Sequence, residues 1–339
     1  MSLSCAELRL QINRLPRVFL GHLPTPLDFC PRLTEALGGP RIYIKRDDCT
    51  GLAFGGNKTR QLEFTVAQGI HQGADVLIGG AGSQSNHCRQ LAAAAANQGV
   101  DCALVVVRDH KSAEIQGNLL LDNLLGVSVQ TVEVDSQEHL DEAKEELIQR
   151  FKREGRNPFV VMDPVNRPYG ALGYALCMAE LADQFERLDE QLNTLVVCSA
   201  STTQPGLLFG NKVLDLGVRI LGIAPIIWSY DLKEAFLGVL GRMGEILEMD
   251  VPFSAEDIIN LDHYLGPNGY GYCSPSGNEA LRMMARTEGI LLDPIYSAKA
   301  LAGLIDLVRI GEIGPDETVV LVHTGGTPAL FAYAEELLN

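Results

Sequence analysis

Short apolar segments alternate with longer helix-forming segments along almost the whole chain. Residues 41–45, 101–107, 195–198 and 318–322 are each predicted to form a strand, and helical patterns lie between them. Strands that alternate with helices at this spacing are typical of βαβ units around a parallel sheet. The sequence therefore predicts an α/β fold with doubly wound parallel sheets.

The same alternation gives bounds for each element. The predicted strands are 41–45, 74–79, 101–107, 128–134, 159–162, 195–198, 218–223 and 318–322. The predicted helices are 30–37, 58–72, 88–98, 113–125, 136–154, 170–187, 231–248, 276–287 and 297–310.

The composition excludes several classes of protein. The chain has 339 residues, enough for one large or two ordinary domains. Its net charge of −16, without a long basic block, argues against nucleic acid and anionic membranes as partners. No apolar run approaches the roughly 20 residues that a membrane span needs. Residues 1–16 include three charged side chains and do not resemble a secretory signal.

The cysteines indicate a reducing compartment. Eight cysteines are scattered along the chain without a CxxC pair. This spacing is typical neither of a disulfide framework nor of a zinc site. We therefore expect a cytoplasmic protein without a structural metal.

Residues 53–63 (AFGGNKTRQLE) contain a candidate nucleophile. Gly55 and Gly56 allow backbone torsions that a Cβ would forbid, and Asn57 is predicted to cap the following helix. Lys58 then falls in the first helical turn, where the helix dipole disfavours its ammonium form. A lysine that is partly neutral suits Schiff-base chemistry. For any single lysine the alternative is a solvated surface residue.

Three turns rich in small residues, 79–87, 198–206 and 323–328, follow predicted strands. Ligands of open parallel sheets bind at the carboxyl ends of strands, where such turns lead into helices. None of the turns matches GxGxxG, and the chain has no GxxxxGK[ST] loop, so a dinucleotide fingerprint and a P-loop are excluded. Each turn by itself is equally explained as a tight connection.

Together, these motifs resemble the family of D-cysteine desulfhydrase and 1-aminocyclopropane-1-carboxylate (ACC) deaminase, of which L-cysteate sulfo-lyase is a close relative. The resemblance runs in matching order from about residue 15 to the C-terminus. Its motifs are PTPL at 24–27, KRDD at 45–48, GGNKTR at 55–60, SNHCRQ at 85–90, GALGY at 170–174, GYG at 269–271, GILLDPIYSAK at 289–299 and HTGG at 323–326. These are fold-type II enzymes, and the resemblance implies pyridoxal 5′-phosphate as the cofactor.

The resemblance implies roles for individual residues at the cofactor. Lys58 would attach covalently to it and, once released, act as base or acid at the substrate Cα. Thr324 would meet the pyridine nitrogen, and Asn86 would lie near the ring hydroxyl. The remaining cofactor contacts would come from Asn57 and from the turn that holds the phosphate: Ser199, Ser201, Thr202, Thr203, Gln204 and Gly206.

A second group of residues would bind the substrate, which the resemblance implies to be a small amino acid. Ser85 and its neighbours would hold the substrate carboxylate at a helix start, although simple helix capping explains a Ser-Asn pair as well. Two tyrosines would approach the reacting atoms. The predicted substrate-binding residues are Gln84, Ser85, Asn86, His87, Tyr270, Tyr296 and Ser297, with Ser85, Tyr270 and Tyr296 also predicted to be catalytic.

The resemblance also implies a domain organisation. A larger cofactor-binding domain would contain residues 1–55 and 165–339, and a smaller α/β domain would contain residues 56–164. The site would lie between them, and the enzyme would be a homodimer.

Two positions separate the branches of the family. The deaminase branch has glutamate after the second tyrosine and leucine before the last Gly-Gly pair, whereas this chain has Ser297 and Thr324. Both residues favour the desulfhydrase and cysteate-lyase branch. The expected reaction is α,β-elimination from a 3-substituted alanine, giving pyruvate, ammonia and sulfide or sulfite. The choice between D-cysteine and L-cysteate stays open.

Three segments depart from the family pattern. The turn 199–206 lacks the internal glycines of the phosphate loop in relatives, and Tyr272-Cys273 replaces a Val/Ile-Pro pair. Residues 163–169 (DPVNRPY) replace a Gly-Gly-Ser-Asn loop, and Arg167 is either a solvated charge or a residue that selects an anionic substrate. These departures leave two alternatives open: a deaminase, racemase or β-substitution enzyme for a less common amino acid, and a homologue that binds without turnover.

Overall fold

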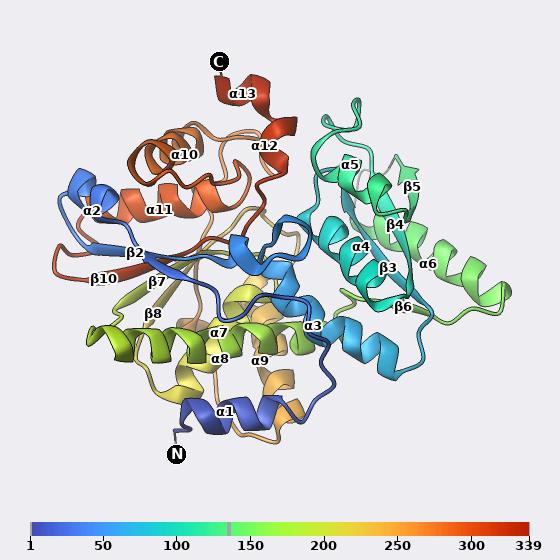
Figure 1. Ribbon diagram of the computed structural model, residues 1–339, viewed down its shortest axis with the longest axis horizontal. Coiled ribbons are helices and arrows are strands. Elements are labelled where there is room, and N and C mark those ends of the chain that lie inside the picture. Colours follow the sequence, from blue (N-terminus) through green and yellow to red (C-terminus); the bar gives the residue numbers. More distant parts are fainter. Residues whose placement is uncertain (1, 134–136, 339) are drawn as a thin grey trace.

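The computed structural model describes residues 2–133 and 137–338 and shows an α/β fold with two separate sheets (Figure 1). The larger sheet has the strand order β1-β2-β10-β7-β8-β9, and the smaller sheet has the order β5-β4-β3-β6. Neighbouring strands are parallel except for the antiparallel pair of β1 and β2. The predicted fold class is confirmed.

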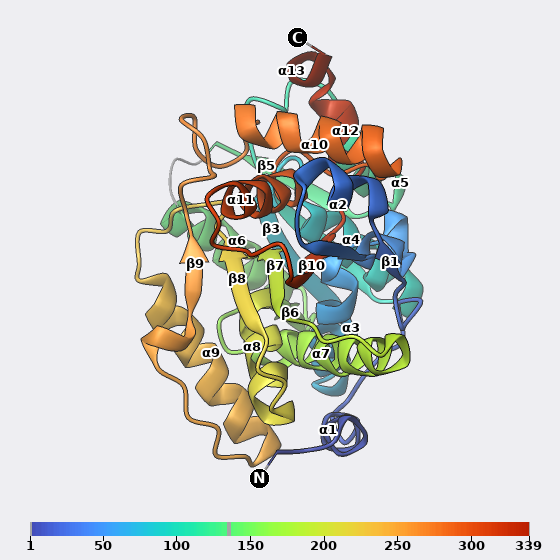
Figure 2. The same ribbon diagram turned by 90° about the vertical axis from the view of Figure 1, so that its left-hand side faces the viewer.

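The larger sheet is covered by helices on both faces, as Figures 1 and 2 show. Its strands are β1 (Leu27–Phe29), β2 (Arg41–Lys45), β10 (Thr318–Val322), β7 (Thr194–Cys198), β8 (Arg219–Ile223) and β9 (Ile259–Leu261). One face packs against α2 (Pro31–Leu37), α10 (Pro275–Glu288) and α11 (Ser297–Arg309). The other packs against α1 (Cys5–Ile12), α7 (Arg167–Leu188), α8 (Thr203–Leu214) and α9 (Leu232–Leu247).

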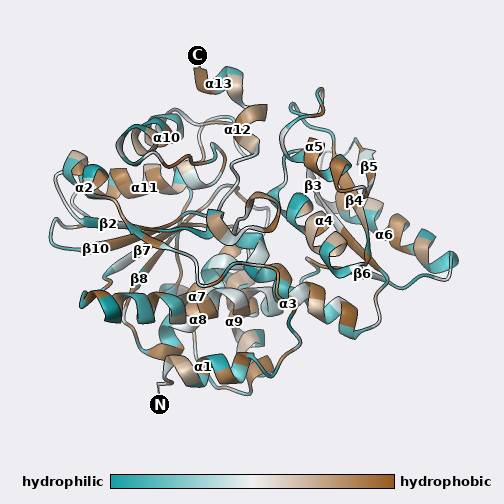
Figure 3. Cartoon of the chain, in the orientation of Figure 1, coloured by the Kyte–Doolittle hydropathy of each residue, from teal (hydrophilic) through white to brown (hydrophobic). Residues whose placement is uncertain are grey.

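Alternation along the central strands divides the larger core into two layers. In β7, Leu195 and Val197 pack with the α7–α8 layer, whereas Val196 and Cys198 pack with the α10–α11 layer. Successive side chains of a strand point to opposite faces, so a strand covered on both faces is apolar throughout. Figure 3 shows this pattern, with hydrophobic strands between helices whose outer faces are hydrophilic.

The smaller sheet has its own two layers. Its strands are β5 (Ser128–Val132), β4 (Asp101–Val107), β3 (Val76–Gly82) and β6 (Pro158–Val160). Helices α4 (Asn86–Gln98) and α5 (Gly117–Leu124) pack on one face, and α6 (Gln137–Arg153) packs on the other. Helix α3 (Asn57–His71) lies between the sheets: Phe64 belongs to the larger core, and Leu62 and Val66 belong to the smaller core.

All the strands and helices predicted from the sequence are present, with ends that shift by a few residues. The ends of the predicted strand 128–134 and helix 136–154 reach residues 134–136, which lie outside the described residues. Elements without predicted bounds are α1, β1, α8, β9, α12 (Ala329–Ala332), α13 (Ala334–Leu338) and the 3₁₀ turns η1 (Asp47–Thr50), η2 (Leu52–Phe54) and η3 (Ala255–Asp257). In residues 2–133 and 137–338 no helix is long and apolar enough to span a membrane.

Candidate active site

The backbone before Lys58 has a conformation that only glycine tolerates. Gly55 and Gly56 have φ values of 66° and 130°. A Cβ on Gly55 would lie 2.1 Å from the Asp48 carbonyl oxygen, and one on Gly56 would lie 2.7 Å from Gln90 Nε2. Gly56 also forms an isolated antiparallel bridge with Gly325 after β10. These contacts fix the start of α3 against the larger sheet.

Lys58 lies in the first turn of α3, as predicted, but the predicted cap is wrong. Helix α3 begins at Asn57 itself, and its N-cap residue is Gly56. The Asn57 side chain instead donates to Thr203 Oγ1 at 3.1 Å, and its backbone N–H donates to the Thr324 carbonyl at 3.0 Å. A tertiary contact has replaced the local capping bond.

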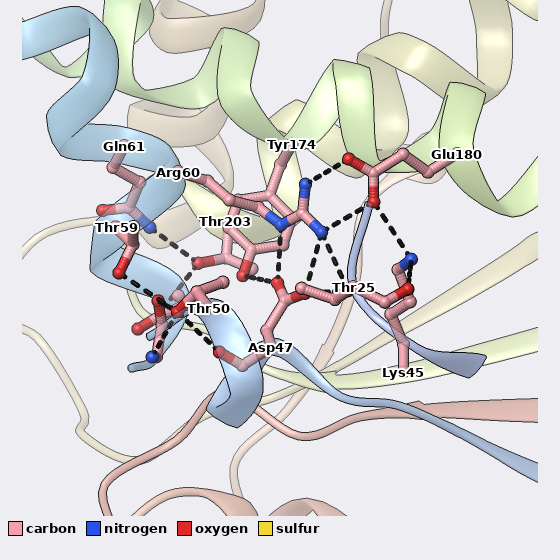
Figure 4. A network of polar contacts seen from close by, with 12 residues as sticks. Thr25, Lys45, Asp47, Thr50, Thr59, Arg60, Gln61, Tyr174, Glu180 and Thr203 are labelled. Carbon is pink, nitrogen blue, oxygen red and sulfur yellow. Dashed lines mark hydrogen bonds and ion pairs between the residues drawn. The ribbon is translucent and has the colours of Figure 1, made fainter. Parts of the chain in front are cut away.

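A buried ion network anchors the same first turn of α3 through Arg60 (Figure 4). The Arg60 guanidinium donates to both carboxylate oxygens of Asp47, at 2.9 Å each, and to both oxygens of Glu180, at 2.8 Å each. Lys45 pairs with Glu180 at 3.0 Å, and the Tyr174 hydroxyl donates to Asp47 at 2.6 Å. Burial by itself would raise the pKa of Asp47, but Arg60 outweighs it and holds that pKa below the usual value. The network joins α3 to β2 and α7.

Lys58 has the electrostatic environment of a nucleophile. Its side chain is half-buried, and its Nζ donates to Gln61 Oε1 at 3.3 Å. Desolvation and then the positive charge of Arg167 lower the pKa of Lys58 to about 8. The neutral amine, which is the form that attacks an aldehyde, is therefore far more populated near neutral pH than in an ordinary lysine.

The turn after β7 leads into α8 and contains most of the predicted phosphate ligands. Ser199 Oγ accepts from the Gln204 N–H at 3.0 Å, and Thr203 Oγ1 accepts from the side-chain amides of Asn57 and Gln61 at 3.1 Å each. Thr202 is fully buried, and its hydroxyl has no partner among the described residues. Such a buried hydroxyl at a helix start suits a bound anion.

Three other predicted phosphate contacts of this turn have different surroundings. The Gln204 side chain donates to the Ile259 carbonyl at 2.7 Å and accepts from Asn260 at 2.8 Å, so it points toward β9. A Cβ on Gly206 would lie 2.1 Å from the Ala171 carbonyl oxygen, so this glycine allows α8 to pack closely on α7. Ser201 is half-buried within the turn.

The predicted carboxylate-binding segment begins α4 at the edge of the smaller sheet. Ser85 is the N-cap residue, and its hydroxyl accepts from the Cys88 N–H at 3.2 Å, so the capping alternative describes its side chain. Asn86 accepts from Asn118 at 2.9 Å, and Gln84 Oε1 accepts from the Asn118 N–H at 2.9 Å. The backbone N–H groups of the first turn remain the donors for an anion.

The His87 imidazole is buried against the smaller sheet. Its Nε2 is 3.6 Å from the position that a Cβ on Gly79 of β3 would occupy, and neither ring nitrogen has a hydrogen-bond partner among the described residues. Burial, then the charges of Lys58 and Lys144, lower the pKa of His87 to about 3. The ring is therefore neutral and packed against β3.

Tyr270 and Tyr296 come together although they belong to different motifs. Their hydroxyl oxygens lie 2.6 Å apart, and their rings meet edge to face with centroids 6.2 Å apart. Desolvation raises the pKa of both hydroxyls, so both are neutral near neutral pH. The pair can pass a proton along its shared hydrogen bond.

Asp293 organises the segment after Tyr296, and the sequence analysis missed it. Its carboxylate accepts from the backbone N–H groups of Tyr296 and Ser297 at 2.8 Å each and from Ser297 Oγ at 2.5 Å. Ser297, predicted to bind substrate, thus has its hydroxyl bound to a buried carboxylate. An aspartate shortly before a helix start is the sequence signal for such a cap.

The donor set fits pyridoxal 5′-phosphate. Lys58 supplies an amine with a lowered pKa for its aldehyde, and the turn before α8 supplies the buried Thr202 hydroxyl and a helix N-terminus for its phosphate. Thr324, which is buried after β10, supplies a neutral hydroxyl near the strand ends.

Comparison with known proteins gives the same answer. The family model described as pyridoxal-phosphate dependent enzyme matches residues 18–325. An ACC deaminase of Burkholderia vietnamiensis is 35% identical over 334 residues, 96% of this chain and 98% of the relative. A D-cysteine desulfhydrase of Salmonella newport is 37% identical over 326 residues, 95% of this chain and 97% of the relative.

Solved structures agree on the fold. The crystal structure of an ACC deaminase homologue has a TM-score of 0.89 and 33% identity, with 98% of each chain covered. A threonine deaminase isoform from Solanum lycopersicum, at 16% identity and a TM-score of 0.64, covers 98% of this chain and 87% of that one and shares the fold. With its lysine, its hydroxyl-rich turn and these relatives, the chain belongs to the family of pyridoxal-phosphate-dependent enzymes, in the group that includes ACC deaminase and D-cysteine desulfhydrase.

Proposed function

We propose that this enzyme catalyses α,β-elimination from a small 3-substituted amino acid such as D-cysteine or L-cysteate. With D-cysteine, the amino acid and one water give pyruvate, ammonia and hydrogen sulfide; L-cysteate gives sulfite in place of sulfide. The observation that supports this choice is Ser297, where the deaminase branch has glutamate, with its hydroxyl held 2.5 Å from Asp293. Position 297 therefore has no carboxylate that could take part in opening the cyclopropane ring of ACC.

Each side chain then has a task at a stated atom. When bound, pyridoxal phosphate supplies the electron withdrawal that acidifies the hydrogen on the substrate Cα. The neutral amine of Lys58 takes that proton. The backbone N–H groups at the start of α4 hold the substrate carboxylate.

The tyrosine pair serves the leaving group. The hydroxyls of Tyr270 and Tyr296 share one proton-bearing hydrogen bond of 2.6 Å and have raised pKa values. We infer that, with a cysteine substrate, the pair donates a proton to the departing sulfur and is reprotonated by water, because neutral hydrogen sulfide leaves more readily than its anion. Thr324 would hold the pyridine nitrogen through a neutral hydroxyl, which would favour prompt loss of the leaving group.

We propose three further properties on the same basis. Residues 1–55 and 165–339 form the larger domain and residues 56–164 the smaller one. The enzyme is a homodimer, as its resemblance to the family implies. The eight free cysteines support a cytoplasmic, reducing location.

The experiment that tests the reaction uses the purified protein loaded with pyridoxal phosphate. D-cysteine, L-cysteine, L-cysteate and ACC are supplied separately, and 2-oxo acid, sulfide and sulfite are measured, with Lys58→Ala as the inactive control. We expect pyruvate with an equal amount of sulfide or sulfite from one of the sulfur substrates. Oxo acid from ACC alone would establish the deaminase reaction instead, and turnover of none of the four would direct a wider amino-acid screen.

A further inference from the structure

The charge of Arg167 acts on Lys58, and Arg167 forms no ion pair within the described residues. It is the first residue of α7, it is half-buried, and its Nε donates to the Met162 carbonyl at 3.3 Å. One turn further along α7, a Cβ on Gly170 would lie 3.4 Å from the Cβ of Gln61. Gln61 in turn donates to Thr203 in the turn before α8. Arg167 is therefore close to both the lysine and that turn.

Two aromatic residues link Arg167 to the same turn from the other side. Trp228 Nε1 donates to the Ala200 carbonyl at 3.1 Å, and the Trp228 ring stacks on Tyr230 with centroids 5.3 Å apart. The Arg167 guanidinium lies close enough to the Tyr230 hydroxyl for its charge to oppose the rise that burial causes in the pKa of Tyr230. Both aromatic residues follow β8.

The strand order places Arg167 relative to the turn that would hold the phosphate. The order β10-β7-β8 puts the 199–206 turn between Thr324, which follows β10, and the aromatic pair, which follows β8. Arg167 lies close to Tyr230 of that pair. The turn that would hold the phosphate therefore lies between Thr324 and the aromatic pair beside Arg167.

The turn by itself offers hydroxyls to a phosphate but neither a cation nor an internal glycine. The hydroxyls of Ser199 and Thr203 accept protein hydrogen bonds that fix their oxygens, and each O–H is still able to donate. No glycine occurs between residues 199 and 205 to bring the backbone close to an anion, and no lysine or arginine occurs there to balance its charge. The unpartnered Thr202 hydroxyl and the start of α8 complete the set of neutral donors. A bound phosphate would carry nearly two negative charges, and a cation beside the turn would stabilise it.

We propose that Arg167 binds the 5′-phosphate of pyridoxal phosphate and compensates for the glycine-poor turn. A guanidinium presents a planar fork of donors that matches two phosphate oxygens. The hydrogen bond from its Nε to the Met162 carbonyl orients the fork. The inference rests on the proposed role of the 199–206 turn, but not on which amino acid is the substrate.

The test compares two cofactor forms that differ only in the phosphate. Apoenzyme is titrated with pyridoxal phosphate and with pyridoxal, and binding is followed by the fluorescence of Trp228, the single tryptophan of the chain. We expect Arg167→Gln to weaken pyridoxal phosphate binding about 10- to 100-fold, the usual range for a hydrogen bond to a charged group. The affinity for pyridoxal, which has no phosphate, should be about the same in the variant as in the wild type. The preference for pyridoxal phosphate over pyridoxal should therefore fall in the variant.

Control variants separate this role from others. Arg187→Gln removes an exposed arginine from the other end of the same helix and should leave both affinities unchanged. Arg167→Lys keeps the charge without the fork and should restore part of the preference. A general effect on Lys58 or on folding would weaken both cofactor forms alike and would overturn the proposal.

One further outcome assigns Arg167 to the substrate. If Arg167→Gln keeps the affinity for pyridoxal phosphate but raises KM for L-cysteate and not for D-cysteine, the residue recognises an acidic substituent, and the proposal is wrong. Because the titration needs no turnover, it gives a result even if the elimination proposed above fails.

Discussion

The hydroxyl oxygens of Tyr270 and Tyr296 lie 2.6 Å apart, joining a loop residue with 41% of its surface exposed to the residue that caps α11. Removing either hydroxyl breaks the same hydrogen bond. We expect Tyr270→Phe and Tyr296→Phe each to lower kcat about 10²- to 10³-fold, as loss of an acid–base group does. The double variant should be little worse than the single ones, because residues that act as a unit are not additive.

The measurement is initial-rate kinetics of oxo-acid formation together with the cofactor absorbance of each variant. Tyr264→Phe is the matched control, since its hydroxyl bonds Asp306 at 2.7 Å next to α11 and away from the tyrosine pair. Additive losses in the double variant would contradict a shared proton path.

The lowered pKa of Lys58 predicts how its reactivity depends on pH. A lysine reacts as the neutral amine, which predominates above its pKa, so its modification rate should rise with pH and level off above about 8. An ordinary lysine would reach this plateau only above about 10.4. Competitive acetylation of the apoenzyme between pH 6 and 11, read by mass spectrometry, gives the midpoint.

The same experiment on Arg167→Gln supplies its control. Because the charge of Arg167 lowers the pKa of Lys58, the midpoint of Lys58 acetylation should lie at higher pH in the variant. Acetylation of an exposed lysine such as Lys233 should be the same in the variant and the wild type. A wild-type midpoint near the ordinary lysine value would show that burial at this position is weaker than the structure indicates.

The Arg60 network predicts a large cost for breaking one buried partner. Arg60→Met leaves the Asp47 carboxylate buried without its main counter-charge, and we expect a loss of about 3–5 kcal/mol in the free energy of unfolding. Denaturant unfolding of the apoenzyme measures it. Arg309→Met is the matched control, because Arg309 pairs with Glu279 on the surface and should cost at most about 1 kcal/mol.

The close packing at Gly206 predicts that Gly206→Ala lowers the stability of the apoenzyme, whereas loss of a phosphate ligand would weaken only cofactor binding. In Gly206→Ala the new methyl group would meet the Ala171 carbonyl oxygen at 2.1 Å, so α8 must move away from α7. We expect a marked fall in the melting temperature of the apoenzyme itself. Gly238→Ala in α9 has no neighbour within 4 Å and should be neutral or stabilising by up to about 1 kcal/mol. Equal melting temperatures of Gly206→Ala and the wild type would show that α8 and α7 can separate without loss of stability.

Local patterns predicted much of this molecule. The bounds of β2, β4 and β10 are the same as those predicted, because each is an apolar run with polar or turn residues on both sides. Lys58 falls in the first helical turn, as the two glycines before it indicate. Such signals lie within a few residues of the feature they specify.

Contacts between distant segments were not predictable in this way. Arg60 and Glu180 are 120 positions apart, and nothing near either residue indicates the pair. Asn57 has the sequence of a helix cap, but its partner Thr203 is 146 positions away. The direction of the Gln204 side chain likewise depends on Asn260, which belongs to a strand that the sequence did not reveal.

Helix α3 contributes Phe64 to one core and Leu62 and Val66 to the other, while the Arg60 network fixes its first turn to the larger sheet. The start of α4, which we propose binds the substrate, packs into the core of the smaller sheet through Cys88 and Leu91. Substitutions that remodel the smaller sheet can therefore change which amino acid is recognised without displacing the lysine that performs the chemistry. New specificities can thus arise in this lineage by drift in one half of the molecule while the other half preserves the reaction.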